Sequence, residues 1–184
     1  MPFQFQAADA EERARRVEFI LMDVDGVLTD GQILLVPDGL GGAREMKAFD
    51  VSDGVGITFA HRVGLRTGIL TGRTSDSVTW RAKDLGIEVV EQGSHNKSDS
   101  YARIRNEHKL GDSIICYIGD DWQDLPMMRR VALAVAPANA CEEVRKIAHI
   151  VTEKPGGRGA VREAIEFILK SQDKWNDAIK RYKF

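Results

Sequence analysis

The sequence has few cysteines, no long apolar run and almost no excess of charge of either sign. Only two of its 184 residues are cysteines, Cys116 and Cys141, and their spacing is typical neither of a zinc site nor of a disulfide framework. We therefore expect reduced thiols in a cytoplasmic protein. No apolar run reaches membrane-spanning length, and residues 1–16 are mixed and charged. Secretion and membrane insertion are therefore not expected.

The charge balance and the length restrict the function further. The 26 Lys and Arg residues nearly balance the 28 Asp and Glu residues, for a formal net charge of -2. Global attraction to nucleic acid or to anionic membranes is therefore not favoured, and a small or locally recognised partner is expected. We find no internal repeat or low-complexity segment, and we expect one domain over residues 1–184, with a solvated lead-in at 1–16 and a tail at 170–184.

The most informative stretch is Phe19–Gly31, FILMDVDGVLTDG. An apolar run that ends in acidic residues is how a buried strand delivers charge to the rim of a sheet. Asp23 and Asp25 are two positions apart, so on a strand they share a face, and a cation would relieve their repulsion. Taken alone, the same pattern also fits an ordinary turn or helix cap.

A β-hairpin is predicted over residues 32–49. Two extended segments, QILLV and AREMKAF, flank the turn-rich PDGLGG, as expected for a hairpin. Placed after an acidic strand end, it would stand over the sheet rim, where it shapes substrate access or pairs with another subunit. A hairpin that folds on its own core is the alternative.

The rest of the chain alternates between helical and extended patterns. A helix from Asp53 to Val63 and a strand from Leu65 to Leu70 are followed by the polar junction Thr71, Gly72 and Arg73. This alternation predicts a three-layer α/β/α, Rossmann-like parallel sheet. Hydroxyls and free backbone amides at the junction suit an anion, although Thr71 taken alone is equally an ordinary strand residue.

Two further polar positions follow. Lys97 stands at the start of a helix, where the helix dipole disfavours a cation, so an anionic ligand explains it better than capping does. The strand Ile114–Ile118 then ends in Gly-Asp-Asp-Trp-Gln-Asp. Helix capping could account for Asp121 or Asp124 singly, but not for Asp120, Asp121 and Asp124 together beside the first acidic pair.

These strand ends predict a phosphoryl-transfer site. The carboxyl edge of an open parallel sheet is where such folds bind ligands. Carboxylates from two strand ends can hold Mg²⁺, and Thr71 and Lys97 supply a hydroxyl and a positive charge for phosphate oxygens.

At these residues the chain resembles the haloacid dehalogenase (HAD) superfamily of aspartate-nucleophile phosphatases, from Val17 to about Leu169. The segments DVDGVLTDG, FDVSDGVGI, ILTGR, YIGDDWQDLPMM and GGRGAVRE are similar to the 3-deoxy-D-manno-octulosonate 8-phosphate (KDO 8-phosphate) phosphatase subfamily, which acts on a sugar acid phosphate of lipopolysaccharide synthesis. The resemblance implies an HAD-like fold and a phosphomonoester hydrolase that needs Mg²⁺.

The resemblance also implies roles for single residues. Asp23 would be the nucleophile and Asp25 the general acid and base. Asp23, the backbone carbonyl of Asp25 and Asp120 would bind the metal. Supporting, phosphate-binding and substrate-binding roles would fall to Asp121 and Asp124, to Thr71, Gly72 and Lys97, and to Arg73 and Arg158.

The gaps between these motifs have no room for a cap domain. The subfamily covers its sites by forming tetramers, so the resemblance implies that the hairpin makes the oligomer and that the loop at 156–159, with Arg158, reaches a neighbouring active site. Arg158 is also a candidate for binding a substrate carboxylate through its paired donors.

Two other functions stay open from the sequence. A phosphorylation-switched receiver module also joins carboxylates, Mg²⁺, a hydroxyl residue and a lysine, but its acceptor Asp would end a middle strand, where this chain has Thr71. Within the family, the chain could act on a nine-carbon ulosonic acid phosphate, such as 2-keto-3-deoxynononate 9-phosphate, or be a catalytically weak domain of the kind attached to sialic acid-activating enzymes.

Overall fold

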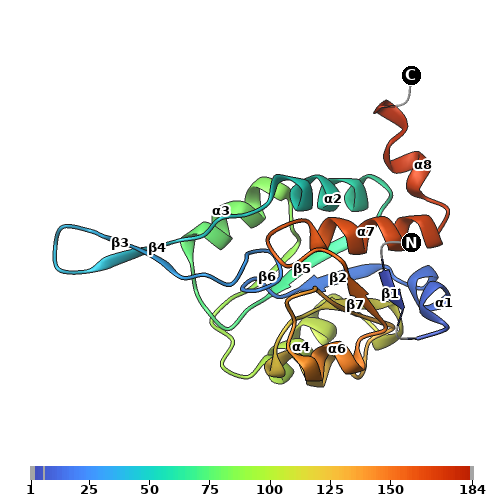
Figure 1. The fold of residues 1–184 in the computed structure, drawn as a ribbon, viewed down its shortest axis with the longest axis horizontal. Coiled ribbons are helices and arrows are strands. Elements are labelled where there is room, and N and C mark those ends of the chain that lie inside the picture. Colours follow the sequence, from blue (N-terminus) through green and yellow to red (C-terminus); the bar gives the residue numbers. More distant parts are fainter. Residues whose placement is uncertain (1–2, 6, 183–184) are drawn as a thin grey trace.

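A computed structural model describes residues 3–5 and 7–182 of the chain (Figure 1). Within them, a seven-stranded sheet has the order β1-β9-β8-β7-β2-β5-β6. All neighbouring strands pair in parallel except β1, which is antiparallel to β9. The strands are β1 (Phe3–Phe5), β2 (Phe19–Met22), β5 (Arg66–Leu70), β6 (Val89–Glu91), β7 (Ile115–Ile118), β8 (Leu133–Ala136) and β9 (Ile150–Thr152).

Helices cover both faces of this sheet, which confirms the predicted three-layer α/β/α fold (Figure 1). One face carries α2 (Val51–Arg62), α3 (Asp76–Leu85) and α7 (Ala160–Ser171), with α1 (Ala10–Arg15) beside α7; the other carries α4 (Lys97–His108), α5 (Leu125–Met128) and α6 (Glu142–Ile147). Short 3₁₀ turns span Asp112–Ile114, Trp122–Asp124 and Lys180–Tyr182.

The central strand β2 explains why both faces are covered. Ile20 and Met22 pack into the core beneath α2 and α7, whereas Phe19 and Leu21 pack into the core beneath α4 and α5. Because successive side chains of a strand point to opposite faces, an unbroken apolar run needs a helical layer on each side.

The expected lead-in holds more structure than its charge pattern indicated. Helix α1 buries Ala10 and Ala14, and β1 adds an antiparallel edge strand, with Gln4 opposite Val151. This strand was not predicted, because three residues are too few for an alternating pattern to be recognised.

Helix α2 begins at Val51, two residues before the predicted start at Asp53. Asp50 is the N-cap, and its side chain accepts a hydrogen bond of 2.6 Å from the Ser52 amide. Asp53 instead lies buried in the first turn and accepts hydrogen bonds from the amides of Gly159 (3.2 Å) and Arg162 (2.7 Å) at the start of α7. Asp53 therefore joins α2 to α7.

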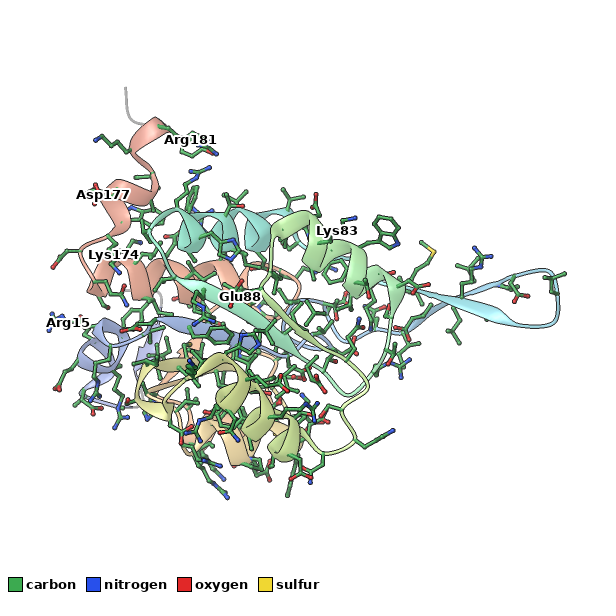
Figure 2. The ribbon with its side chains drawn as sticks, turned by 180° about the vertical axis from the view of Figure 1, so that it is seen from behind. Arg15, Lys83, Glu88, Lys174, Asp177 and Arg181 are labelled. Atoms are coloured by element: carbon green, nitrogen blue, oxygen red, sulfur yellow. The ribbon has the colours of Figure 1, made fainter. Side chains whose placement is uncertain are left out.

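The predicted hairpin is present as β3 (Leu34–Pro37) and β4 (Ala43–Met46), which form a separate two-stranded sheet. It stands clear of the body of the molecule in both views (Figures 1 and 2). Its apolar side chains are exposed, including Leu35 (63 %) and Leu40 (93 %). The hairpin thus has no core of its own.

The C-terminal tail packs on its own chain at the opposite end from the hairpin. The rings of Trp175, in α8 (Trp175–Ala178), and of Tyr182 lie 5.8 and 5.9 Å from the ring of Phe59 in α2. Figure 2 shows the labelled Asp177 and Arg181 at this end. Across residues 3–5 and 7–182, no helix has the length and apolar character to cross a membrane.

Within the described part of the chain, no cap domain interrupts the sheet. The chain between Asp25 and Thr71 forms the hairpin, α2 and β5, and the chain between Thr71 and Lys97 forms α3 and β6. Among the described residues, the hairpin base and loops of the same domain therefore lie at the carboxyl edge of the sheet.

Candidate active site

The three motif-bearing strands are neighbours in the middle of the sheet. β2 pairs with β5 on one side and with β7 on the other, both in parallel and in matching register at Met22, Ile69 and Ile118. The residues that follow each strand therefore emerge at one edge.

Lys97 lies between two carboxylates at this edge. Its Nζ is 2.7 Å from Asp23 Oδ2 and 2.7 Å from Asp124 Oδ1, and its side chain is 2 % exposed. Asn96 is the N-cap of α4, and its side chain accepts a hydrogen bond from the Ser98 amide. Lys97 is therefore not needed for capping, and its side chain points into the site. A buried ammonium is stable only when paired, and these two carboxylates neutralise it.

Asp124 organises the acidic loop rather than standing free in it. Its Oδ1 also accepts a hydrogen bond of 2.8 Å from the buried Tyr117 hydroxyl. Its Oδ2 accepts from the amides of Asp120 (3.0 Å) and Asp121 (3.2 Å). Both oxygens of this fully buried carboxylate are thus used to hold Lys97 and to shape the turn after β7.

Asp120 and Asp121 are adjacent in the chain but have different surroundings. Oxygens of Asp23, Asp120 and Asp124 all lie within 4.8 Å of one another, a set that suits a metal ion. Asp120 Oδ1 is buried and has no hydrogen-bond partner among the residues that the structure describes. Asp121 is exposed, and its Oδ1 accepts the Trp122 amide at 2.8 Å. Asp120 thus faces the cluster and Asp121 caps the turn beside it.

The electrostatics of the cluster favour a cation. Burial raises the pKa of Asp23 to about 6, with Lys97 opposing and Asp124 reinforcing the shift. Burial, together with the charges of Asp23 and Asp124, raises the pKa of Asp120 to about 8. A bound divalent ion would oppose both shifts, because it stabilises the charged carboxylates, and hard carboxylate oxygens are ligands that Mg²⁺ prefers.

The backbone conformation and the close surroundings of residue 26 require a glycine after the first acidic pair. Its φ is +87°, and a Cβ at this position would lie 2.0 Å from Asp120 Oδ2. A larger residue would be strained and would displace Asp120 from the cluster. The DxDG pattern therefore shapes the metal-binding edge as well as supplying its acids.

A pocket of about 360 Å³ opens beside the cluster. It brings together the predicted Asp23, Asp25, Thr71, Gly72 and Arg73 with three residues that the sequence analysis missed, Ser94, His95 and Gln123. The first two follow β6, the neighbour of β5, and Gln123 lies within the acidic loop. The rule that strand ends gather at one edge would have found Ser94 and His95, had it been applied to the short strand β6.

Asp25 lies at the mouth of this pocket. Its carboxylate pairs with Lys47, which follows β4 at the base of the hairpin, and Arg73 Nε is 3.8 Å away. Lys47 was not foreseen, because 22 residues separate it from Asp25 and no motif marks it.

Arg158 is not brought into the pocket of its own chain. Its guanidinium is 3.3 Å from Asp30, and its side chain is 67 % exposed. The surrounding glycine-rich loop packs on the loop after β2: the Gly157 amide donates to Val27 O at 2.9 Å. The glycine-rich loop thus packs against the loop that carries Asp23 and Asp25, while the Arg158 side chain is exposed to solvent.

Comparisons with known proteins identify the family of this chain. Residues 66–165 match the family of haloacid dehalogenase-like hydrolases. The 3-deoxy-D-manno-octulosonate 8-phosphate phosphatase of Escherichia coli (strain K12) is 37 % identical over 172 residues, which cover 94 % of this chain and 89 % of that protein.

Solved structures show the same fold. A phosphatase of the same name from Moraxella catarrhalis, in complex with a magnesium ion, a phosphate ion and a KDO molecule, is 36 % identical, with a TM-score of 0.90 and coverage of 95 % of this chain and 98 % of that one. The Yersinia pestis phosphatase is 38 % identical, with a TM-score of 0.87 and coverage of 91 % and 89 %.

HAD phosphatases use Mg²⁺, and the cluster of Asp23, Asp120 and Asp124 offers the carboxylates that such an ion needs. The fold, the cluster and the similarity over most of the sequence lead to one assignment. The chain belongs to the haloacid dehalogenase-like hydrolases and is a phosphatase similar to the 3-deoxy-D-manno-octulosonate 8-phosphate phosphatases.

Proposed function

We propose that this phosphatase hydrolyses 3-deoxy-D-manno-octulosonate 8-phosphate to the free sugar acid and inorganic phosphate, a step of lipopolysaccharide sugar synthesis. The observation that carries the proposal is the buried group of Asp23, Lys97 and Asp124 beside an open pocket, in a chain that is 37 % identical to the Escherichia coli phosphatase over 94 % of its length.

Asp23 is the proposed nucleophile. Its carboxylate attacks phosphorus, the bond from phosphorus to the sugar oxygen breaks, and an aspartyl phosphate forms. Two unit charges of like sign 4 Å apart repel by roughly 4 kcal/mol at an effective dielectric constant of ~20. Lys97, 2.7 Å from Asp23, offsets that repulsion, and Thr71 and Gly72 bind the phosphoryl oxygens from the other side of the pocket.

Asp25 is the proposed proton carrier. In the first step its carboxylic acid protonates the departing sugar oxygen, and in the second its carboxylate takes a proton from the water that cleaves the aspartyl phosphate. Its place at the pocket mouth, on the side of the hairpin, suits a group that meets the leaving sugar.

Asp23, the backbone carbonyl of Asp25 and Asp120 would hold Mg²⁺, with Asp121 and Asp124 in support. When bound, the ion neutralises charge on the phosphoryl group and on the carboxylates. The unpartnered Asp120 Oδ1 supports a direct role for Asp120. The hydrogen bonds that occupy both Asp124 oxygens support a positioning role for Asp124.

The sugar acid would be recognised by arginines. Arg73 lines the pocket, and a guanidinium binds a carboxylate through paired donors. Arg158 points away from its own pocket, toward Asp30, so we propose that it serves the site of a neighbouring copy.

A complementation experiment tests this neighbour role. Mixed oligomers of Asp23→Asn and Arg158→Ala chains contain sites with an intact Asp23 and a neighbour's Arg158. They should recover activity that neither variant has alone, and failure to recover it would assign Arg158 to its own chain.

The proposed assembly is a homotetramer in the cytoplasm. The exposed apolar face of the hairpin, which includes Ile33, Leu35 and Met46, supports self-association, since contiguous exposed apolar surface marks interaction sites. The free thiols Cys116 and Cys141 suit a reducing compartment. A monomer by light scattering at working concentration would contradict the assembly.

A phosphate-release screen tests the substrate. With Mg²⁺ present, eight- and nine-carbon ulosonic acid phosphates are compared side by side, and kcat/KM should be highest for the eight-carbon compound. A preference for the nine-carbon compound would retain the reaction but change the substrate. A stoichiometric, long-lived phosphoprotein without turnover would contradict the proposed reaction.

A further inference from the structure

Lys47 is a buried lysine at the foot of an exposed hairpin. Its side chain is 1 % exposed, although Met46 beside it is 52 % exposed. A buried ammonium needs a compensating charge. Lys47 has two: the Asp25 carboxylate, through Oδ1, and Glu45 Oε1 at 3.0 Å.

These contacts belong to a group of four alternating charges, made by Asp25, Glu45, Lys47 and Arg73. Arg73 pairs with Glu45, and its Nε is 3.8 Å from Asp25 Oδ2. Glu45 lies in β4 and Lys47 directly after it. The group therefore ties the hairpin to the loops that follow β2 and β5.

Lys47 is also the closest side-chain partner of Asp25 among the described residues. Thr29 Oγ1 lies 3.4 Å from Asp25 Oδ1, at the outer limit of a hydrogen bond, and Arg73 Nε is farther still. Neither contact is short enough to fix the carboxylate. Without Lys47, these two longer contacts would be the remaining side-chain restraints on the Asp25 carboxylate among the described residues.

We propose that Lys47 is a positioning residue, which holds the Asp25 carboxyl in place for proton transfer and so makes the base of the hairpin part of the catalytic machinery. This rests on the proposed function, in which Asp25 carries the proton. A displacement of about 1 Å at a reacting group can reduce a rate by roughly 100-fold. Loss of the contact between Lys47 and Asp25 should therefore lower the rate of turnover more than the affinity for the substrate.

The kinetic test uses p-nitrophenyl phosphate. Its leaving group departs without a proton, so the first step needs little from Asp25, whereas the second step still needs Asp25 as a base. Lys47→Met keeps the aliphatic stem and removes the charge. We expect a burst of p-nitrophenol close to the size of one enzyme equivalent, followed by steady turnover about 10- to 100-fold slower than in the wild type.

Three further variants complete this test. Asp25→Asn should show the same pattern more strongly, and Lys47→Arg should restore part of the steady rate. Lys146→Met removes an exposed ion pair with Glu142 and should behave as the wild type. If Lys47→Met slows both steps equally, or only lowers the melting temperature, Lys47 is a structural anchor and the proposal is wrong.

A second readout does not depend on activity or on the folding of Lys47→Met. In wild-type protein, the buried ammonium of Lys47 should give a slowly exchanging ¹H–¹⁵N signal in NMR spectra. Asp25→Asn should shift or abolish that signal, while Asp124→Asn should affect the signal of Lys97 instead. An unchanged Lys47 signal in Asp25→Asn would overturn the proposal.

The two readouts separate the two proposals. A Lys47 signal that responds to Asp25→Asn, in a protein that hydrolyses no sugar phosphate, would retain the contact and reject the proposed function. Normal kinetics of Lys47→Met on a hydrolysed substrate would retain the function and reject the role of Lys47.

Discussion

At the scale of single residues, the site depends on carboxylates whose environments differ. Asp23 and Asp120 are held where burial raises their pKa values, whereas Asp124 is satisfied by Lys97, Tyr117 and two amides. The same residue type thus suits the proposed nucleophile, a proposed metal ligand and a structural anchor, because each position has different neighbours.

Asp23→Asn tests the nucleophile directly. We expect turnover to fall by at least about a thousandfold, because an amide cannot form the aspartyl phosphate. The fold should be retained, since Lys97 keeps its contact with Asp124 and a buried charge is removed. The measurement is phosphate release together with a circular dichroism spectrum. Activity in a normally folded variant would refute the assignment of Asp23.

Asp53 predicts a pH dependence of stability that is separate from catalysis. Burial raises its pKa from 3.8 to about 6, so between these values the folded state holds a proton that the unfolded state has lost. The free energy of unfolding therefore includes a contribution that is present below pH about 4 and is lost as the pH rises to about 6.

Urea denaturation from pH 4 to 7 measures this contribution. The fall in stability should be smaller in Asp53→Asn, which does not titrate, than in the wild type. Asp84→Asn, at an exposed position on α3, serves as the control and should follow the wild type. Equal slopes in the wild type and in Asp53→Asn would contradict the raised pKa.

At the scale of elements, two loops interlock beneath the catalytic residues. Asn139 bridges them: its Nδ2 donates to Gly26 O at 2.9 Å, and its Oδ1 accepts the Gly156 amide at 2.6 Å. The backbones approach so closely that a Cβ on Gly156 would lie 1.9 Å from Gly26 O. The loop after β9 therefore sets the position of the DxDG turn.

Gly156→Ala should force these loops apart. We expect a loss of kcat of roughly tenfold or more, because Asp25, the proposed proton carrier, is next to Gly26 and small displacements are costly there. Steady-state kinetics and thermal unfolding measure the effect. Gly111→Ala is the matched control, since its nearest neighbour would be Ser113 Oγ at 3.5 Å. If both variants behave alike, the interlocking does not matter for catalysis.

At the scale of the whole molecule, the hairpin and the C-terminal tail lie at opposite ends (Figure 2). The tail is anchored on α2 by Trp175 and Tyr182, whereas the hairpin carries apolar residues that the described part of the chain leaves exposed. This difference in exposure indicates that the hairpin end, and not the tail, takes part in the proposed assembly.

Leu35→Asp tests that assembly. A charge on the exposed hairpin should lower the mass in solution from tetramer toward monomer, because desolvating a carboxylate in an apolar interface is unfavourable. Light scattering measures the mass. Trp80→Asp, at a residue 69 % exposed on α3, should leave it unchanged. A tetramer in Leu35→Asp would place the interface elsewhere.

The sequence alone determined the fold class and most of the site. Parallel strands bring their carboxyl ends to one edge whatever the packing details, so Asp23, Thr71 and Asp120 could be placed together from their positions after apolar runs. The hairpin was also predictable, because its turn residues and extended segments are local features.

Only the tertiary structure decided how the side chains divide the work. The partnership of Asp124 with Tyr117, the contact of Lys47 with Asp25 and the outward position of Arg158 depend on the distances between residues far apart in the chain. Those distances follow from the packing of the hairpin and helices on the sheet. Hydrophobic periodicity reports which face of an element is buried, but not which charged groups meet across the edge.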